Sequence, residues 1–302
     1  MVKVSVLMNC YNSEKYLRET INSVINQTFD DWEIIFWDNQ STDASAAIVN
    51  SYNDERIKYY FSTSHTTLYE GRNAALKYCT GKYLAFLDCD DLWVRDKLEK
   101  QVSVFERYDD TVLVYSNTIF FNSDLNKENI LNRKPQLSGY IFRENMLRYK
   151  FSLETVMVRM KTVISNDLNF GKKFNMIGDQ DFLSMVCYFG DVFYIDEPLG
   201  KWRIHANNFS KTLHHSYARE LKSMYLRFND KLGDAFTREM RISIYNEIVF
   251  REAFMLLTTS GSDVRHKLKK VRFFYSKGLL LRLLSYIPTK IALRVLNFLK
   301  RS

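Results

Sequence analysis

Three aspartates lie within four residues at the end of an apolar segment. Asp88, Asp90 and Asp91 follow residues 83–87, which are apolar enough to form a buried strand. Carboxylates this close repel one another, and a bound divalent cation offsets that repulsion. Mg²⁺ and Mn²⁺ accept such oxygen ligands and bridge diphosphate oxygens. The spacing therefore predicts a metal and diphosphate site, with one alternative: Asp90 or Asp91 caps the helix expected near Trp93.

Polar residues also end two earlier segments with strand character. Asn9-Cys10-Tyr11 ends the β-branched run 3–10, and Asp38-Asn39 follows the apolar run 33–37. Apolar residues at helical spacing separate these runs. The expected order is strand 3–10, helix from Ser13, strand 33–37, helix 43–53, strand 57–61, helix from Tyr69 to before Gly81, and strand 83–87.

This alternation is typical of an α/β fold with a mainly parallel, Rossmann-like sheet flanked by helices on both faces. Ligands of such sheets gather at the carboxyl ends of the strands. The three polar segments lie at those ends, so we expect them to form one site.

The second half of the chain gives a weaker pattern. We expect a polar loop over 122–138 and a helix beginning near Asp179, and from about residue 214 the pattern becomes helical. The other elements expected are a helix at 94–107 and strands at 111–117, 153–159 and 192–204. These patterns divide the chain into a catalytic domain over 1–212 and a helical C-terminal region over 213–302.

Five ordered segments in the first hundred residues resemble family 2 glycosyltransferases of the GT-A fold. They are Val4 to Asn12, Ser23 to Thr28, Asp38 to Asp43, Gly71-Arg72-Asn73-Ala74-Ala75, and Gly81 to Asp91. Gly178-Asp179-Gln180-Asp181-Phe182 and Glu197 to His205 resemble acceptor-side motifs of the same family. The resemblance covers residues 1–210 and implies transfer of a sugar, with inversion, from a nucleotide diphosphate to a hydroxyl.

The resemblance also implies roles for the residues at the strand ends. Tyr11 would border the nucleotide base, and Asp38 and Asn39 would meet the base edge or the ribose. The family usually has a second Asp where this chain has Asn39, which can donate as well as accept a hydrogen bond. A uracil base, and hence a UDP-sugar, remains the expectation. Further residues expected around the nucleotide are Asn9, Cys10, Arg72, Asp88 and Cys89.

The metal and the catalytic base complete the expected site. Asp90, together with Asp91, would hold Mn²⁺ or Mg²⁺, which stabilises the departing diphosphate. His205 would contact the diphosphate or add a metal ligand, although a lone histidine is more often structural. Asp179 would be the general base, with Asp181 as the fallback. The alternative for Asp179 is that it caps the helix that follows.

The C-terminal segment is strongly basic. Residues 264–302 hold eleven Lys or Arg and no Asp or Glu, which leaves the preceding residues at a formal net charge of −3 against +8 for the whole chain. Its apolar residues interleave with the basic ones, as in amphipathic helices that lie on an anionic membrane surface. The alternative is packing on the main domain or on a second subunit in a homo-oligomer. A nucleic-acid partner is disfavoured because the main body lacks a recognised reader motif.

Four cysteines without paired spacing indicate free thiols in a reducing cytosol. The chain has no uncharged run of about 18 apolar residues, so we expect a cytoplasmic protein that is peripheral on the membrane's inner face. A lipid-linked or glycan acceptor in surface polysaccharide or glycolipid assembly fits this expectation. Two other functions stay open: a nucleotidyltransferase, which needs a Gly-rich basic loop near its N-terminus, and an inactive membrane-associated scaffold.

Overall fold

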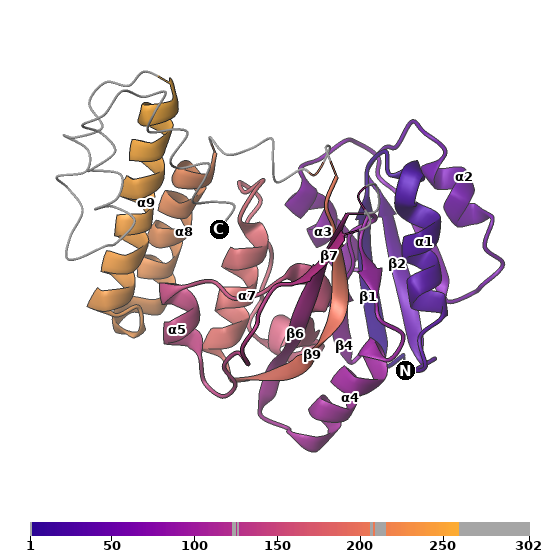
Figure 1. Cartoon of the computed structure of the whole chain (residues 1–302), viewed down its shortest axis with the longest axis horizontal. Coiled ribbons are helices and arrows are strands. Elements are labelled where there is room, and N and C mark those ends of the chain that lie inside the picture. The colour runs from indigo at the N-terminus through magenta and orange to yellow at the C-terminus, as the bar shows by residue number, and fades with distance from the viewer. Residues whose placement is uncertain (1, 123–124, 126, 206–207, 209–215, 260–302) are drawn as a thin grey trace. The chain divides into compact units, whose positions relative to one another are not determined.

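The N-terminal half alternates strands and helices as expected. A computed structural model describes residues 2–122, 125, 127–205, 208 and 216–259 (Figure 1). Its first elements are β1 (Val4–Cys10), α1 (Glu14–Ile25), β2 (Trp32–Asp38), α2 (Ser45–Asn50), β3 (Ile57–Phe61), α3 (Leu68–Leu76) and β4 (Tyr83–Phe86). The four strands pair in parallel in the order β3-β2-β1-β4. Their carboxyl ends therefore lie along one edge of the sheet.

The register of these strands brings the polar segments together. Cys10 lies opposite Asp38 across β1 and β2, and Leu7 lies opposite Phe86 across β1 and β4. The residues at or just after the ends of β1, β2 and β4 include most of those predicted to bind the nucleotide and the metal. The parallel pairing thus explains why segments 80 residues apart in sequence meet.

The remaining strands make the sheet mixed. They run in the order β4-β8-β6-β9-β5, with β8 antiparallel to both β4 and β6, and β6 parallel to β9. The elements are β5 (Leu92–Trp93), α4 (Lys97–Arg107), β6 (Thr111–Asn122), β7 (Lys127–Ile130), α5 (Phe142–Leu147), the 3₁₀ turn η1 (Leu153–Thr155), β8 (Met157–Arg159), α6 (Met160–Ser165), α7 (Gly178–Tyr188) and β9 (Asp191–Arg203). The α/β fold is confirmed, with antiparallel strands added to its parallel half.

Several elements differ from the sequence prediction: Leu92–Trp93 form a strand and the helix expected at 94–107 begins at Lys97. Two further differences have a clear physical reason. The segment 122–138 was expected to be a loop, yet it contains β7, whose residues are all exposed. An edge strand without a buried face has no alternation for a sequence pattern to detect. The strand expected at 153–159 is a 3₁₀ turn followed by three strand residues, because Ser152 accepts the backbone N–H of Thr155 and closes a turn there.

The core explains why α1 covers the parallel strands. Leu17, Ile21 and Val24 recur at helical spacing and are fully buried against residues of β1 and β2. Burying each such side chain stabilises the fold by roughly 1.5–3 kcal/mol. This packing fixes the helix beside the strand ends that carry the polar residues.

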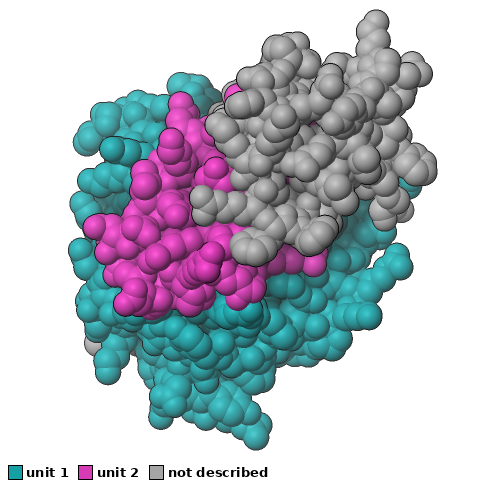
Figure 2. All heavy atoms as spheres, turned by 90° about the vertical axis from the view of Figure 1, so that its left-hand side faces the viewer, with its two compact units in different colours: residues 1–145, 149–208 teal, residues 146–148, 209–302 magenta. Residues whose placement is uncertain are grey.

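Two compact units divide the chain, and Figure 2 colours them teal and magenta. The first comprises residues 1–145 and 149–208, and the second comprises 146–148 and 209–302. In the second unit, α8 (Tyr217–Leu232) and α9 (Arg238–Thr259) contact each other as a helical hairpin. The predicted domain boundary at 212 stays a prediction. The basic segment 264–302 lies outside the described residues, and within those residues no helix has the length and apolarity to span a membrane.

Candidate active site

The side chains at the end of β2, Asp38 and Asn39, form hydrogen bonds within the protein. Asp38 is fully buried, and its two oxygens accept hydrogen bonds from the Ser41 backbone N–H at 2.7 Å and the Tyr59 hydroxyl at 2.8 Å. The Asn39 amide donates to the Thr66 carbonyl at 2.8 Å, and its Oδ1 accepts from the Thr66 backbone N–H at 3.1 Å. Asp38 therefore shapes the end of the strand, and Asn39 fastens the loop that leads into α3.

The fastened loop sets the start of α3. Thr67 caps the helix, and its hydroxyl accepts from the Glu70 N–H while the Glu70 carboxylate accepts from the Thr67 N–H. Such a reciprocal capping box fixes where a helix begins. Because Thr66 immediately precedes it, the Asn39 contact also positions α3 and the side chains it carries.

Two aromatic rings lie exposed beside this loop. Tyr11 is 51% exposed, and its ring centroid lies 4.4 Å from that of His65. His65 Nδ1 lies 2.9 Å from the Asn39 carbonyl oxygen, which ties the imidazole to the end of β2. The pair provides an aromatic surface where a nucleobase is expected to stack. Sequence analysis missed His65, because a histidine in a polar loop gives no periodic signal.

One wall of the predicted nucleotide pocket lies between β1 and β4. It is formed by Asn9, Cys10 and Cys89. Cys10 Sγ lies 3.7 Å from Ser41 Oγ, and the Cys89 thiol donates to the Asn9 carbonyl at 3.6 Å. Hydrogen bonding from Cys89 lowers the pKa of Cys10 to about 7, against the opposing effect of burial. Gly71 lets α3 approach this wall, because a Cβ there would lie 2.6 Å from Asn9 Oδ1.

Asp88 is paired with an arginine from α3. The Arg72 guanidinium donates to Asp88 Oδ1 at 2.5 Å, and Arg72 is only 3% exposed whereas the Asp88 side chain is 43% exposed. The buried cation therefore holds an exposed carboxylate in place. Among the described residues, Arg72 contacts only the Oδ1 oxygen of Asp88.

Asp90 and His205 are brought together from distant parts of the chain. His205 Nε2 lies 2.8 Å from Asp90 Oδ2, and the His205 backbone N–H donates to Asn208 Oδ1 at 2.7 Å. Burial, and next the nearby Asp88 carboxylate, raise the pKa of Asp90, while its hydrogen bond with His205 opposes the rise. A cation at this point would relieve the cost of the buried charge.

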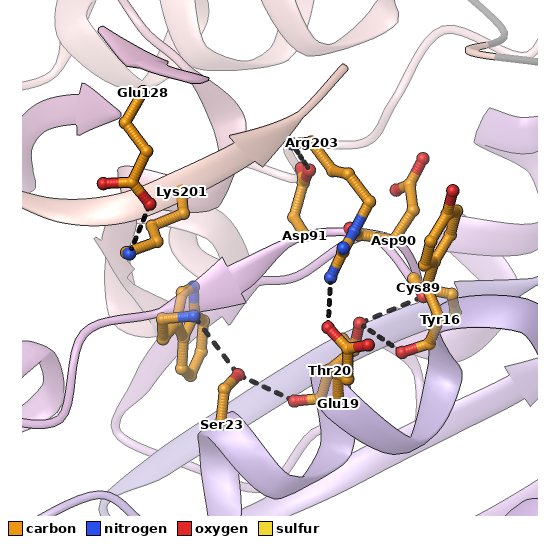
Figure 3. Close-up of polar contacts among 11 residues, drawn as sticks. Tyr16, Glu19, Thr20, Ser23, Cys89, Asp90, Asp91, Glu128, Lys201 and Arg203 are labelled. Atoms are coloured by element: carbon orange, nitrogen blue, oxygen red, sulfur yellow. Dashed lines mark hydrogen bonds and ion pairs between the residues drawn. The ribbon is translucent and has the colours of Figure 1, made fainter. Parts of the chain in front are cut away.

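Asp91 faces a different partner. It is 4% exposed, and its Oδ1 accepts the backbone N–H of Arg203 at 2.8 Å, as Figure 3 shows. The Arg203 guanidinium in turn donates to the Asp90 carbonyl at 2.8 Å and to Glu19 of α1 at 2.7 Å. The structure therefore does not group Asp91 with Asp90 and His205. The buried Arg203 guanidinium thus forms a salt bridge with the exposed Glu19 carboxylate, and this bridge joins β9 to α1.

Asp90 and His205 are the side chains best placed for a metal. Within the described residues, no three His, Cys, Asp or Glu side chains are grouped closely enough to hold a metal ion. Mg²⁺ commonly uses one or two carboxylates together with substrate phosphates rather than a complete protein cage. An aspartate oxygen in contact with an imidazole nitrogen fits a site of that kind.

Asp179 lies in the first turn of α7 and is held by two tyrosines. Tyr69 donates to its Oδ1 at 3.1 Å, and Tyr149 donates to its Oδ2 at 3.2 Å. Burial raises the pKa of Asp179, against the opposing effects of Arg72 and the hydrogen bonds. A carboxylate with a raised pKa suits proton removal near neutral pH. The fallback, Asp181, is fully buried.

Comparison with known proteins identifies the family of this chain. The sequence profile described as Glycosyl transferase family 2 matches residues 5–167, more than half of the chain. This protein belongs to glycosyl transferase family 2. The match includes Asn9 to Asn39, Arg72 and the three aspartates after β4.

This family-2 chain is similar to two relatives and one solved structure, to different extents. It is 36% identical over 121 residues to the UDP-Glc:alpha-D-GlcNAc-diphosphoundecaprenol beta-1,3-glucosyltransferase WfgD of Escherichia coli, a match that covers 40% of this chain and about half, 47%, of that protein. It is 33% identical over 214 residues to an uncharacterized glycosyltransferase of Methanocaldococcus jannaschii, covering 67% of this chain and 70% of that one. Residues 1–349 of S. aureus TarS in complex with UDP-GlcNAc share its fold, with a TM-score of 0.68, 19% identity, and coverage of 94% of this chain and 79% of that one.

Sequence analysis of this family-2 chain missed three residues near the predicted site. His65, Tyr69 and Tyr149 contact Tyr11 or Asp179 but lie outside the motifs quoted for the family. Tyr69 gave the strongest available signal, since it lies two residues before the Gly71-Arg72 motif. Tyr149 gave none, because contacts between residues 30 positions apart leave no periodic trace.

Proposed function

We propose that this protein is an inverting glycosyltransferase that moves a sugar from a UDP-sugar to a hydroxyl of a glycan or lipid-linked acceptor. One observation carries the proposal: α3 supplies both Arg72, which holds Asp88, and Tyr69, which holds Asp179. Residues proposed for the donor and for the acceptor are thereby tied to one helix. Family membership supports the same reaction class.

The donor site would use the carboxyl ends of β1, β2 and β4. Tyr11 and His65 would stack on the base, with Asn9, Cys10, Asp38 and Cys89 forming the pocket wall. Asn39 would contribute its position rather than its side chain, since its amide is engaged by Thr66. Asp88, fixed by Arg72, would accept a hydrogen bond from a hydroxyl of the ribose or the sugar.

Asp90 and His205 would hold Mn²⁺ or Mg²⁺ together with diphosphate oxygens. A bound divalent cation supplies Lewis-acid stabilisation of the departing diphosphate. Asp91 would keep β9, and with it the segment that carries His205, against the loop after β4 through the Arg203 backbone.

Asp179 would accept the proton of the acceptor hydroxyl as that oxygen attacks the anomeric carbon. The acceptor oxygen attacks the face opposite the leaving group as the bond to the diphosphate breaks, and this single displacement inverts the anomeric configuration. The raised pKa of Asp179 matches the task, because its carboxylate then has useful basicity near neutral pH.

The acceptor is suggested by a relative and by the charge of the C-terminal segment. The E. coli relative is named for a diphosphoundecaprenol-linked acceptor. A lipid-linked acceptor would fit a protein working in the cytoplasm at the inner membrane face, with the basic segment 264–302 on anionic lipid. Surface polysaccharide or glycolipid assembly is the process that such an acceptor serves.

A binding and turnover panel tests the proposal. Sugar nucleotides with UDP, GDP, CMP and dTDP carriers are compared in Mn²⁺, Mg²⁺ and EDTA, using the unmodified protein, Asp90→Ala and the exposed control Asp109→Ala. We expect a UDP-sugar to bind with metal, Asp90→Ala to lose about 100-fold or more of turnover, and Asp109→Ala to behave as the unmodified protein. Failure of every sugar nucleotide to bind would contradict the proposal and favour the scaffold function.

A further inference from the structure

The two tyrosines at Asp179 differ in how firmly they are held. Tyr69 is 3% exposed, and its ring is stacked with that of Phe170 at 5.6 Å. Gly178 lies against the same ring, since a Cβ there would approach it to 2.6 Å. Tyr69 is therefore locked within a helix, between a second ring and the α7 backbone.

Tyr149 occupies a looser setting. It lies between α5 and η1, in a stretch that belongs to no helix or strand, and it is partly exposed. Its ring meets Phe151 edge to face at 5.6 Å. Of the two hydroxyls on the carboxylate, the one from Tyr149 is the easier to displace.

We propose that Tyr69 and Tyr149 are positioning residues for the catalytic base, and that the acceptor hydroxyl replaces the Tyr149 hydroxyl at Asp179 Oδ2. This inference rests on the proposed function because it takes Asp179 as the base. A base must lie within about 2.6–3.2 Å of the oxygen whose proton it removes. Both carboxylate oxygens already have donors at that distance, so the acceptor takes the place of the donor that lies outside any helix or strand.

The exchange has a chemical consequence. A hydrogen bond donated to a carboxylate stabilises the anion and lowers its basicity. When Tyr149 leaves Oδ2, the base becomes stronger at the moment the acceptor arrives. Tyr69 stays on Oδ1 and keeps the carboxylate oriented throughout.

The charged and hydrogen-bonding groups that face Asp179 determine the pH at which its carboxyl group loses its proton. From α3 they are Arg72 and the Tyr69 hydroxyl, from the segment after α5 the Tyr149 hydroxyl, and from α7 the backbone N–H of Gln180. Removing either hydroxyl raises the pKa of Asp179, so the base stays protonated to a higher pH. The acidic limb of the rate profile should then move up by about one pH unit, the size expected for one hydrogen bond to a charged group.

A titration of the full-length protein tests the contacts without substrate. The carboxyl ¹³C resonance of Asp179, assigned from its loss in Asp179→Asn, is followed against pH. We expect Tyr69→Phe and Tyr149→Phe each to raise the midpoint by about one unit. The control Tyr115→Phe should leave it unchanged, since that hydroxyl donates to the Leu137 carbonyl. Unchanged midpoints in both test variants would overturn the inference.

Steady-state kinetics then test the exchange, with UDP-glucose and an N-acetylglucosaminyl diphosphate on a short alkyl chain. The pH profile of kcat/KM for the acceptor reports the enzyme before acceptor binds, and that of kcat reports the loaded enzyme. Tyr69→Phe should shift both profiles, whereas Tyr149→Phe should shift kcat/KM alone. A shift of kcat in Tyr149→Phe would mean that its hydroxyl stays on the base, which overturns the exchange.

Asp179→Asn separates this inference from the proposed function. If Asp179→Asn transfers sugar as fast as the unmodified protein, the assignment of the base is wrong and the proposed function fails with it. If Asp179→Asn is inactive and the tyrosine variants leave both profiles unshifted, the base stands and only the positioning roles fall.

Discussion

Four aspartates illustrate how the surroundings of one residue type assign different tasks. Asp38 and Asp91 are buried and accept backbone N–H groups, so each stabilises a turn or a strand end. Asp90 meets an imidazole, and Asp179 lies between two hydroxyls. Only the last two keep the partners expected of a metal ligand and a base. Their chemistry depends on neighbours that come from other elements.

Replacing each of two histidines should separate metal binding from binding of the nucleobase. His205→Ala removes the imidazole beside Asp90, so we expect the Mn²⁺ concentration for half-maximal turnover to rise about 10- to 100-fold. His65→Ala removes the ring beside Tyr11, so we expect weaker UDP affinity with an unchanged Mn²⁺ requirement. Metal titrations of turnover and calorimetry with UDP measure the two effects. Equal Mn²⁺ curves for His205→Ala and the unmodified protein would exclude His205 as a ligand.

At the scale of elements, α3 organises the site. Its start is set by the Asn39 contact with Thr66 and by the capping box that follows. Tyr69 and Arg72 lie three residues apart, on neighbouring positions of one helix face. A shift of α3 would therefore disturb Asp88 and Asp179 together.

Asn39→Asp should destabilise the protein even though it restores the usual residue of the family. An aspartate cannot donate to the Thr66 carbonyl and would set a carboxylate oxygen against it. We expect the free energy of unfolding to fall by about 1–3 kcal/mol. Urea denaturation measures it, with the exposed Asn53→Asp as a control within about 0.5 kcal/mol of the unmodified protein. An unchanged stability would show that the amide donor at residue 39 has no structural role.

Gly178→Ala should impair catalysis more than folding. The added methyl would meet the Tyr69 ring and move either that ring or the start of α7. A displacement of about 1 Å at a base can cost about 100-fold in rate. We expect kcat to fall by that order while UDP-sugar affinity is retained, as measured by turnover and calorimetry. Full activity would indicate that the position of Tyr69 is not critical.

At the scale of the whole molecule, the predicted site and the excess positive charge lie in different parts of the chain. The first compact unit contains the sheet and every predicted site residue, and the second contains the α8–α9 hairpin. The net positive charge concentrates in 264–302, beyond the described part of the chain, because that segment has eleven Lys or Arg and no Asp or Glu. Attraction of this segment to anionic lipid is expected to contribute about 1 kcal/mol per basic residue near the surface.

Removing residues 264–302 should abolish membrane binding and spare donor binding. We expect the full chain to sediment with phosphatidylglycerol vesicles and not with phosphatidylcholine vesicles. The fraction that sediments should fall as the salt concentration rises. The shortened chain should stay in the supernatant and keep its UDP-sugar affinity. Sedimentation of both chains to the same extent would contradict a membrane role for this segment.

Sequence patterns predicted the parallel half of the fold well because its determinants are local. Apolar strands followed by Asp38 or Asp88, and helices with an apolar face, are visible within windows of about ten residues. The partners of Asp91, Asn39 and Asp179 were not predictable, because each contact joins segments 27 to 112 residues apart. The short exposed strand β7 was missed for want of any buried face.

The most direct test of Asp179 as the base of an inverting transfer is the anomeric configuration of the product. ¹H NMR of the sugar transferred from an α-linked UDP-sugar to an N-acetylglucosaminyl diphosphate acceptor, with Asp179→Asn run in parallel, reports both the stereochemistry and the base. We expect a β-linked product that forms only when Asp179 is intact. An α-linked product, or a β-linked product formed equally well by Asp179→Asn, would contradict it.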